Sequence, residues 1–507
     1  MNIINFAILI FTELLIDPTL LGRKADQYFS RRKRHVLSRI SFEKTLQKVS
    51  SSSFDIARLE GLRLYSEAQR VAEGRPSINP IKSWEKYRLR KKKELLECCI
   101  AESRPISKKQ GEVRTLHYFT NSLPHTRSGY TERSIRVIDG QQKAGLKVFA
   151  ATRYNYPLSI GVLRFSRDDI IEGVPVYRLI PSFVPLSWSK RKDLAVRQLV
   201  DLCVELDIDV LQTTTGFENA EIVSLAAEAL GIPWTYEVRG ELEETWISKQ
   251  PSELRSLAQA SDFYRMARKN EEKAMMLASR VISLSEVSKQ SLVERGINSR
   301  KIKIIPNGVD EAMFDQDLTK EDARKRLGLE SGKTFVGSVT SVVGYEGLDI
   351  LVRALEYLPE NVCGVVVGDG EALDELIDWA NSLGVSDRMF FPGRKDQSEA
   401  LVWYKALDVF TVPRRNTTVC QRVTPIKAAN AQALGLPVVA SDLPALKEVT
   451  GGYAVYVKPE DPKALAKGIL SALTGDAPRA PLNWLESRSW SANGIRYASI
   501  LRGSEFQ

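Results

Sequence analysis

The stretch "ENAEIVSLAAEALGIPWTYEVRG" (residues 218–240) carries the clearest fold signal in the chain. It reads as a helix that stops at Gly231 and leads into a strand. Residues 197–215, "RQLVDLCVELDIDVLQTTT", show the same helix-to-strand order directly before it. Helices and strands that alternate in this way predict parallel strands joined by helical crossovers, as in a doubly wound α/β sheet.

The same alternation extends outward in both directions. It covers residues 113–153 on the amino side and residues 278–310 on the carboxyl side, and it starts again at residues 333–341. The second series ends with "TPIKAANAQALGLPVVASD" (424–442), in which a helix start near Pro425 is followed by a glycine stop and a buried strand. We therefore expect two Rossmann-like domains that face each other across a cleft. Ligands of such sheets bind at the carboxyl ends of the strands, and free N–H groups at a helix start can meet an anion there.

Length and composition fit a globular protein with more than one domain. The 507 residues exceed one ordinary core, and 43% hydrophobic with 27% charged residues is a typical balance. Five cysteines (Cys98, Cys99, Cys203, Cys363 and Cys420) show no metal-ligand spacing, which favours a reduced, cytoplasmic setting. Only three histidines are present, which argues against a His-rich metal site.

The basic excess is concentrated at the amino end. Residues 1–110 hold 23 Lys and Arg against 12 Asp and Glu, whereas the rest of the chain holds 49 against 51. This predicts either a solvated helical arm or attraction to an anionic membrane surface; no motif of a nucleic-acid module is present. The apolar stretch 3–16 is too short for a spanning helix and lacks the flanks of a signal peptide, so we expect a buried or interfacial helix.

Common nucleotide-binding and hydrolase motifs are missing. There is no GxGxxG with a following acidic residue, Walker A sequence, GxSxG elbow or HExxH. A different ordered set of segments is present: "SGYTERS" (128–134), "YEVRGELEETW" (236–246), "VISLSEVSKQSL" (281–292), "IIPNGVD" (304–310), "YEGLDILVRAL" (345–355), "VVVGDGEALDEL" (365–376), "FFPG" (390–393) and "VTPIKAANAQALGLPVVASDLPALKEV" (423–449).

This set resembles the retaining nucleotide-sugar glycosyltransferases of family 4, which have the GT-B fold. It is most similar to a bacterial branch with an HTxSGYT motif, and the resemblance covers roughly residues 112–505. It implies an acceptor domain over 111–306, a donor domain over 307–482 and a helix over 483–507 that crosses back to the first domain. Residues 1–110 form the basic, mainly helical arm outside the resemblance. The family transfers sugar without a metal or other cofactor.

The resemblance assigns a set of donor-binding positions. Many relatives carry an Arg and, eight residues later, a Lys that bind the diphosphate; here Ser338 and Glu346 stand at those places. Arg414, Arg415, Arg422 and Lys427 are the basic residues that could compensate, although solvation of Arg414 and Arg415 at the surface is equally compatible with the sequence. The full donor set is Ser128, Gly129, Gly337, Ser338, Gly393, Arg414, Arg422, Thr424, Lys427 and Asn430.

Two family glutamates are replaced, by Arg422 and Asn430. The second normally holds the ribose hydroxyls, and an amide offers one acceptor and one donor group where a carboxylate accepts both bonds. Charged hydrogen bonds contribute about 1 kcal/mol more than neutral ones, so we expect weaker donor binding rather than lost chemistry.

On the acceptor side, His125 and Arg239 are the predicted catalytic contacts. His125 would position acceptor or donor sugar, with a structural role as the alternative. Arg239 would contact an anion, with an internal salt bridge to Glu241 or Glu243 as the alternative.

The predicted function is transfer of a sugar from a nucleoside diphosphate to a glycan or lipid-linked acceptor in cell-envelope or exopolysaccharide synthesis, in the cytoplasm or at the inner membrane face. Because Ser338, Glu346 and Asn430 depart from the family pattern, a degenerate binding or scaffold subunit of a glycan-assembly complex stays open. A GT-B phosphorylase or an epimerase is weaker, since neither residue set is recognisable.

Overall fold

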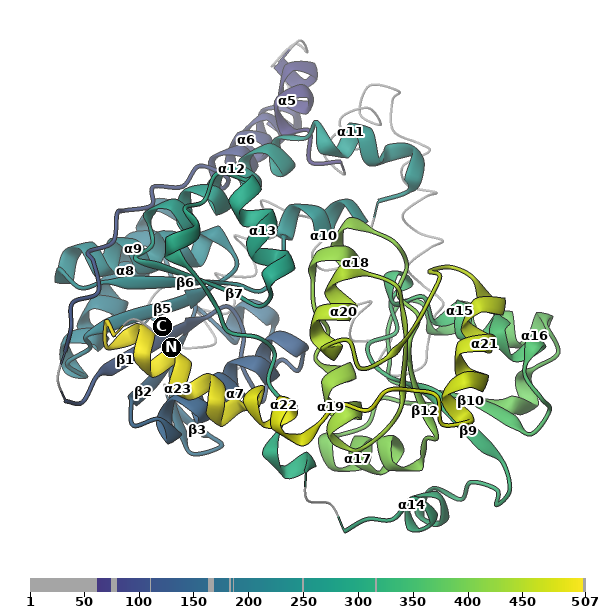
Figure 1. Cartoon of the computed structure of the whole chain (residues 1–507). Helices are drawn as coiled ribbons and strands as arrows, with labels where there is room; N and C mark the ends of the chain where they lie inside the picture. The colour runs from purple at the N-terminus through teal and green to yellow at the C-terminus, as the bar shows by residue number, and fades with distance from the viewer. Residues whose placement is uncertain are drawn as a thin grey trace. The chain divides into compact units, whose positions relative to one another are not determined.

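The computed structural model describes residues 62–73, 80–109, 111–162, 168–181, 184–185, 187–248, 250–314 and 317–504. The chain forms two compact units, each built around a sheet (Figure 1). The first comprises 1–134, 146–281 and 501–503, and the second 135–145, 282–500 and 504–507, within those described ranges. The predicted apolar helix at 3–16 and the basic run at 31–35 lie outside the described residues.

The first sheet has eight strands in the order β3-β4-β2-β1-β5-β6-β7-β8. The pairs β1–β2, β1–β5, β2–β4 and β5–β6 are parallel, and β3 runs antiparallel at one edge. The strands are β1 (Arg114–Phe119), β2 (Lys147–Thr152), β3 (Asp168–Ile171), β4 (Val174–Arg178), β5 (Val210–Thr214), β6 (Trp234–Val238), β7 (Arg280–Ser283) and β8 (Ile302–Ile304).

Among the described residues before β8, the α-helices are α5 (Tyr65–Glu73), α6 (Pro80–Glu94), α7 (Gly129–Lys143), α8 (Trp188–Glu205), α9 (Phe217–Leu230), α10 (Leu242–Ser248), α11 (Arg255–Gln259), α12 (Asp262–Leu277) and α13 (Glu286–Glu294). The quoted stretch 218–240 forms α9 and β6, and Gly231 ends the helix with φ +68°. The glycine stop and the strand after it are therefore both confirmed.

The second sheet has six strands in the order β11-β10-β9-β12-β13-β14, and every neighbouring pair is parallel. The strands are β9 (Thr334–Val339), β10 (Val362–Val367), β11 (Met389–Gly393), β12 (Val409–Val412), β13 (Val438–Ser441) and β14 (Val455–Val457).

The helices that follow β8 are α14 (Lys320–Leu327), α15 (Leu348–Ala354), α16 (Leu373–Ser382), α17 (Gln397–Ala406), α18 (Thr418–Arg422), α19 (Lys427–Ala433), α20 (Pro444–Thr450), α21 (Pro462–Leu473), α22 (Leu482–Ser487) and α23 (Trp490–Leu501).

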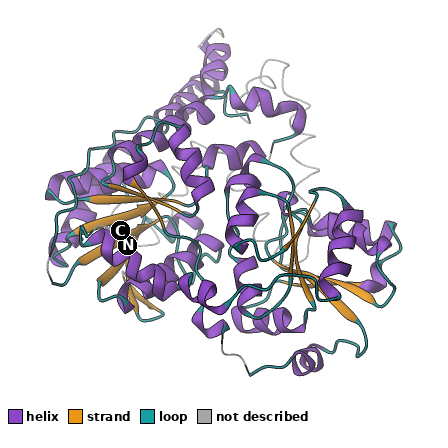
Figure 2. Ribbon diagram, viewed as in Figure 1, coloured by secondary structure: helices purple, strands orange, loops and turns teal. Residues whose placement is uncertain are grey.

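Helices cover both faces of the second sheet, as Figure 2 shows. Alternate strand residues point to opposite faces: Val336 and Val366 join one buried cluster with α15 and α21, whereas Phe335 and Val365 join another with α17 and α20. Burial on both faces explains why these strands are continuous apolar runs. The predicted class, two Rossmann-like α/β domains, is confirmed.

Within the second unit, α7 and α23 cross at two glycines. A Cβ added to Gly494 would lie 1.9 Å from the carbonyl oxygen of Gly140, and one added to Gly140 would lie 2.4 Å from that of Trp490. The crossing therefore requires glycine on both helices. In the described ranges, no helix is long and apolar enough to cross a bilayer.

Candidate functional site

A pocket lies at the carboxyl ends of β9 and β12, where the strand order of the second sheet reverses. The sheet continues through β10 and β11 on one side of β9 and through β12, β13 and β14 on the other. Ser338 of β9 and Thr340 just after it line the pocket, together with residues 410–413 at the end of β12 and Lys427 of α19. Ligands of open α/β sheets bind at such reversal points.

Glu346 lines this pocket and forms a buried ion pair with Arg414, which lies beside it. Nε and Nη2 of Arg414 donate to the two carboxylate oxygens at 3.1 and 2.6 Å. Burial opposes ionisation of Glu346, but the guanidinium outweighs it, so the pKa of the carboxyl falls below its usual value. Burial also opposes the charge on Arg414, yet Glu346 raises the pKa of the guanidinium further. Both groups therefore stay charged at neutral pH.

The backbone around Gly347 brings this pair together. Gly347 has φ +67°, and a Cβ there would lie 2.1 Å from the carbonyl oxygen of Pro413. Only glycine allows the turn at Gly344–Glu346 to pack so closely against the end of β12. Arg414 follows Pro413 directly, and its Nη1 donates to the carbonyl oxygen of Val423 at 2.8 Å. The ion pair thus links the ends of both strands to the segment before α19.

Lys427 is the cation that lines the pocket itself. Its Nζ donates to Oγ1 of Thr340 at 3.1 Å. Burial lowers the pKa of Lys427, Glu346 opposes that shift, and Arg414 adds to it. A lysine in this setting gains stabilisation from any anion that enters the pocket.

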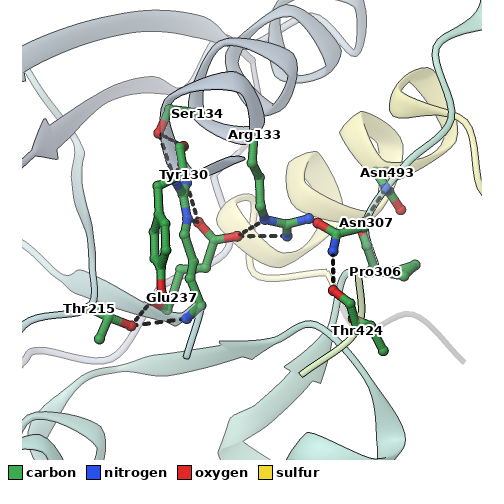
Figure 3. A network of polar contacts seen from close by, with 10 residues as sticks. Tyr130, Arg133, Ser134, Thr215, Glu237, Pro306, Asn307, Thr424 and Asn493 are labelled. Carbon is green, nitrogen blue, oxygen red and sulfur yellow. Dashed lines mark hydrogen bonds and ion pairs between the residues drawn. The ribbon is translucent and has the colours of Figure 1, made fainter. Parts of the chain in front are cut away.

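Two predicted donor residues adjoin Lys427. Asn430 is half-buried on α19, three residues further along and hence on the same helical face. Thr424 is buried; its carbonyl oxygen accepts from Asn307 at 2.9 Å (Figure 3). The Oγ1 atom of Thr424 is also buried and has no hydrogen-bond partner among the described residues. Such an atom is costly to leave unsatisfied.

The other predicted donor residues of the second unit occupy different settings. Ser338 is buried and donates to the carbonyl oxygen of Thr411 at 2.6 Å. Gly337 lies inside β9, where a Cβ would meet the carbonyl oxygen of Val365 at 2.0 Å, so packing of the strands already requires glycine. Gly393 ends β11 with φ +74°. Arg422 ends α18 and is half-buried, and Arg415 pairs with Asp349 at 2.8 Å.

In the first unit, Glu237 at the end of β6 holds two arginines. Arg133 of α7 approaches one carboxylate oxygen at 2.7 Å (Figure 3). Arg239 approaches the other at 2.6 Å. Burial opposes ionisation of Glu237, but the two guanidinium groups outweigh it and lower the pKa to about 2. Arg239 also donates to the carbonyl oxygen of Tyr130 and to Ser134, both at 2.7 Å. The carboxylate partner of Arg239 is thus Glu237, where the sequence suggested Glu241 or Glu243.

The loop after β1 carries the remaining predicted residues. Ser128 and Thr131 exchange hydrogen bonds at the start of α7, so Ser128 caps the helix. Gly129 is exposed and lies outside the left-handed region, and a Cβ added there would meet no atom within 4 Å. The fold alone therefore does not require glycine there. His125 is half-buried with its ring edge-on to Tyr156 at 6.1 Å.

Sequence reasoning missed two features of the pocket. Glu346 was interpreted only as the replacement of a lysine that binds the diphosphate in many relatives, and Thr340 was not singled out. The carboxylate at position 346 and the arginine at position 414 were a usable signal, because charges buried in an apolar domain are usually paired. The contact itself joins residues 68 apart and depends on tertiary structure.

Two Rossmann-like domains with a pocket at a strand reversal define the class of protein, the GT-B fold. Sucrose-phosphate synthase from Thermosynechococcus elongatus has a TM-score of 0.56 at 18% identity, covering 77% of this chain and 94% of that one. HepE from Anabaena, solved in complex with UDP and glucose, has a TM-score of 0.54 at 18% identity, covering 76% and 95%. At these identities the likeness shows the fold.

Two family models of glycosyl transferases match separate parts of the chain. Residues 128–308 match the glycosyl transferase 4-like domain, and residues 319–486 match glycosyl transferases group 1. A D-inositol 3-phosphate glycosyltransferase of Xylanimonas cellulosilytica is 33% identical over 42% of this chain. The lipopolysaccharide core mannosyltransferase LpsB of Rhizobium meliloti is 32% identical over 39%. The chain spans about half the length of these relatives, 52% and 55% respectively.

Proposed function

We propose that the protein is a retaining glycosyltransferase of the HTxSGYT branch that moves a sugar from a nucleoside diphosphate to a glycan or lipid-linked acceptor. The observation that carries the proposal is the pocket at the β9–β12 reversal, with Lys427 in it and a buried Arg414 beside it. Relatives named as transferases of cell-envelope glycans support the same activity and direct it to envelope or exopolysaccharide synthesis.

The charges of the pocket suit the chemistry of this reaction. Negative charge develops on phosphate oxygens as the nucleoside diphosphate leaves, and fixed donors stabilise it best because they need little reorganisation. Lys427 supplies an ammonium within the pocket, and Glu346 orients the guanidinium of Arg414. We propose that these cations, without a metal, balance the leaving group; activity that is unchanged by a chelator is the expected result.

The replacement at Asn430 is proposed to weaken donor binding. The half-buried amide lies on the same face of α19 as Lys427, where a ribose hydroxyl can reach it. Exchanging a charged hydrogen bond for a neutral one costs about 1–2 kcal/mol, or roughly tenfold in affinity. Asn430→Glu is therefore expected to tighten nucleotide binding by about that factor.

Nucleotide binding is the first test. Thermal shifts and titrations with UDP, GDP and a panel of their sugars should reveal saturable binding to the purified full chain. Lys427→Gln should weaken that binding at least tenfold, because a charged hydrogen bond contributes about 1.5–3 kcal/mol. Lys467→Gln, an exposed lysine of α21, is the matched control. If no nucleotide binds either the wild-type chain or Asn430→Glu, the proposal is wrong.

Turnover and stereochemistry form the second test. With the donor that binds, NMR of the released or transferred sugar should show the anomeric configuration of the donor at the start of the reaction; inversion would overturn the retaining assignment. The relatives carry transferase names, and no comparison supports the alternative of a non-catalytic scaffold.

A further inference from the structure

Residues 96–109, here called the strap, cross the first unit between α9 and α12. The carbonyl oxygen of Leu96 accepts from Asn270 of α12 at 2.6 Å. On the other side, the backbone N–H groups of Cys99 and Ala101 donate to Glu221 and Ser224 of α9 at 2.8 and 3.0 Å. Side chains from both helices thus hold the backbone of the strap at successive positions.

The strap ends at the amino edge of the sheet. The N–H of Ser103 donates to the carbonyl oxygen of Leu277, the last residue of α12, at 2.9 Å. The N–H of Trp234, the first residue of β6, donates to Oγ of Ser103 at 2.9 Å. These contacts fix one end of the strap where strands begin, so its other end lies toward the edge where strands end.

The α5–α6 hairpin is attached at that carboxyl edge. The backbone N–H and the hydroxyl of Ser66 donate to the carboxylate of Asp262, the first residue of α12, at 2.6 and 2.9 Å. Leu96 packs against Phe217, which follows the end of β5 closely. In Figure 1 the hairpin accordingly lies next to the start of α12.

The packing of the hairpin leaves the basic residues at the end of α6 partly exposed, with Lys91–Lys93 half-buried. Leu89 of α6 is buried against Ala68 and Ala72 of α5. Arg90 is 61% exposed, and Lys91–Lys93 occupy the last turn of α6. Glu94 pairs with Arg90 and Lys91 and offsets one of these charges. Tyr87 is 45% exposed on the same helix, and tyrosine favours the interface between water and lipid.

We propose that α6 is a docking surface for an anionic lipid bilayer, held by the strap on the sheet edge where the first unit meets its acceptor. The inference rests on the proposed function, because it assigns the acceptor to the membrane. Residues 1–110 carry the whole basic excess of the chain, and clustered lysines are attracted to anionic headgroups. A bilayer touching α6 places lipid-linked acceptors on the side of the first unit where its strands end.

Vesicle sedimentation of the full chain tests this surface. The probe is phosphatidylcholine vesicles with and without phosphatidylglycerol, at low and high salt. We expect binding only with phosphatidylglycerol, weakened by salt. The triple variant K91Q/K92Q/K93Q should bind at least about tenfold more weakly, and glutamine preserves helix propensity. The matched control is K325Q/R326Q/K467Q, which removes three exposed charges from the second unit.

The docking surface and the transferase proposal are tested by different results. Equal losses for the two triple variants, or no loss for K91Q/K92Q/K93Q, would overturn the docking surface. Tighter binding to a single-stranded RNA than to the anionic vesicles, lost in the same variant, would also overturn it and assign a nucleic acid instead. Nucleotide binding is measured without vesicles, so failure of the docking surface leaves the transferase proposal intact. If neither the wild-type chain nor Asn430→Glu binds a nucleotide, the transferase proposal is wrong, whereas the vesicle result is unaffected.

Discussion

Replacing Glu271 by glutamine is expected to remove much of the pH dependence of the stability of the first unit. Glu271 lies on α12 and is 3% exposed. Its carboxylate accepts from the N–H of Phe217 at 2.8 Å and from the hydroxyl of Tyr236 at 2.6 Å. Burial, opposed by the Tyr236 hydrogen bond and reinforced by Glu243 and Glu218, raises the pKa of Glu271 to about 8.

The sign of the effect follows from the raised pKa. The ordinary pKa is 4.5 and the folded one is about 8, so the folded state binds this proton more tightly than the unfolded state. The contribution of Glu271 is complete below about pH 4.5 and is lost as the pH rises toward 8. Each pKa unit corresponds to about 1.4 kcal/mol, so stability should fall by about 3 kcal/mol between about pH 5 and pH 8.

Urea unfolding followed by tryptophan fluorescence at several pH values measures this slope. Glu271→Gln keeps the size of the side chain and stays neutral, so its midpoint should change far less with pH than that of the wild type. Glu228→Gln, an exposed glutamate of α9, should leave the wild-type slope intact. A Glu271→Gln protein that loses stability with pH as steeply as the wild type would refute the reasoning.

Two further perturbations concern the second unit. Arg414→Met leaves the charge of Glu346 buried without its partner and should cost about 3–5 kcal/mol of unfolding free energy. The double variant with Glu346→Gln should recover part of this stability but not nucleotide affinity. A loss below about 1 kcal/mol in the single variant would contradict the burial of the pair. Gly494→Ala should cost at least about 1–3 kcal/mol by calorimetry, because its Cβ would lie 1.9 Å from a carbonyl oxygen of α7. Gly344→Ala, whose Cβ would meet no atom within 4 Å, is the control for that substitution, and equal losses would argue against the helix crossing.

The sequence predicted most of the sheet architecture because its signals are local. An apolar run of four to six residues after a glycine stop, as at Gly231, identifies a buried strand without knowledge of its neighbours. The length of α19 was harder to predict from the sequence. It spans only Lys427–Ala433, so it begins two residues after Pro425 and ends shortly before Gly435, whose φ is +75°.

The strap could not be predicted, because no local signal in the sequence indicates its contacts. Residues 96–109 have no regular secondary structure, and polar side chains such as Asn270 and Ser224 hold their backbone. Serine and asparagine inside a helix pattern usually indicate a solvated face. Only the fold shows that these side chains point at a third segment from the start of the chain.

The Glu346–Arg414 pair is better explained by the pocket than by stability. Removing two ions from water offsets most of their attraction, so an apolar pair of similar size would stabilise the unit about as well. An apolar pair could not, however, hold a fixed positive group beside the pocket. Glu346 and the carbonyl oxygen of Val423 bind Arg414 from two sides, so its orientation is set before any ligand arrives. Lys427, held by one hydrogen bond to Thr340, is the cation free to shift toward a phosphate. The pocket therefore has one adaptable cation in its lining and one fixed cation beside it. A preorganised guanidinium of this kind suits the departing diphosphate of the proposed reaction, because it needs little reorganisation.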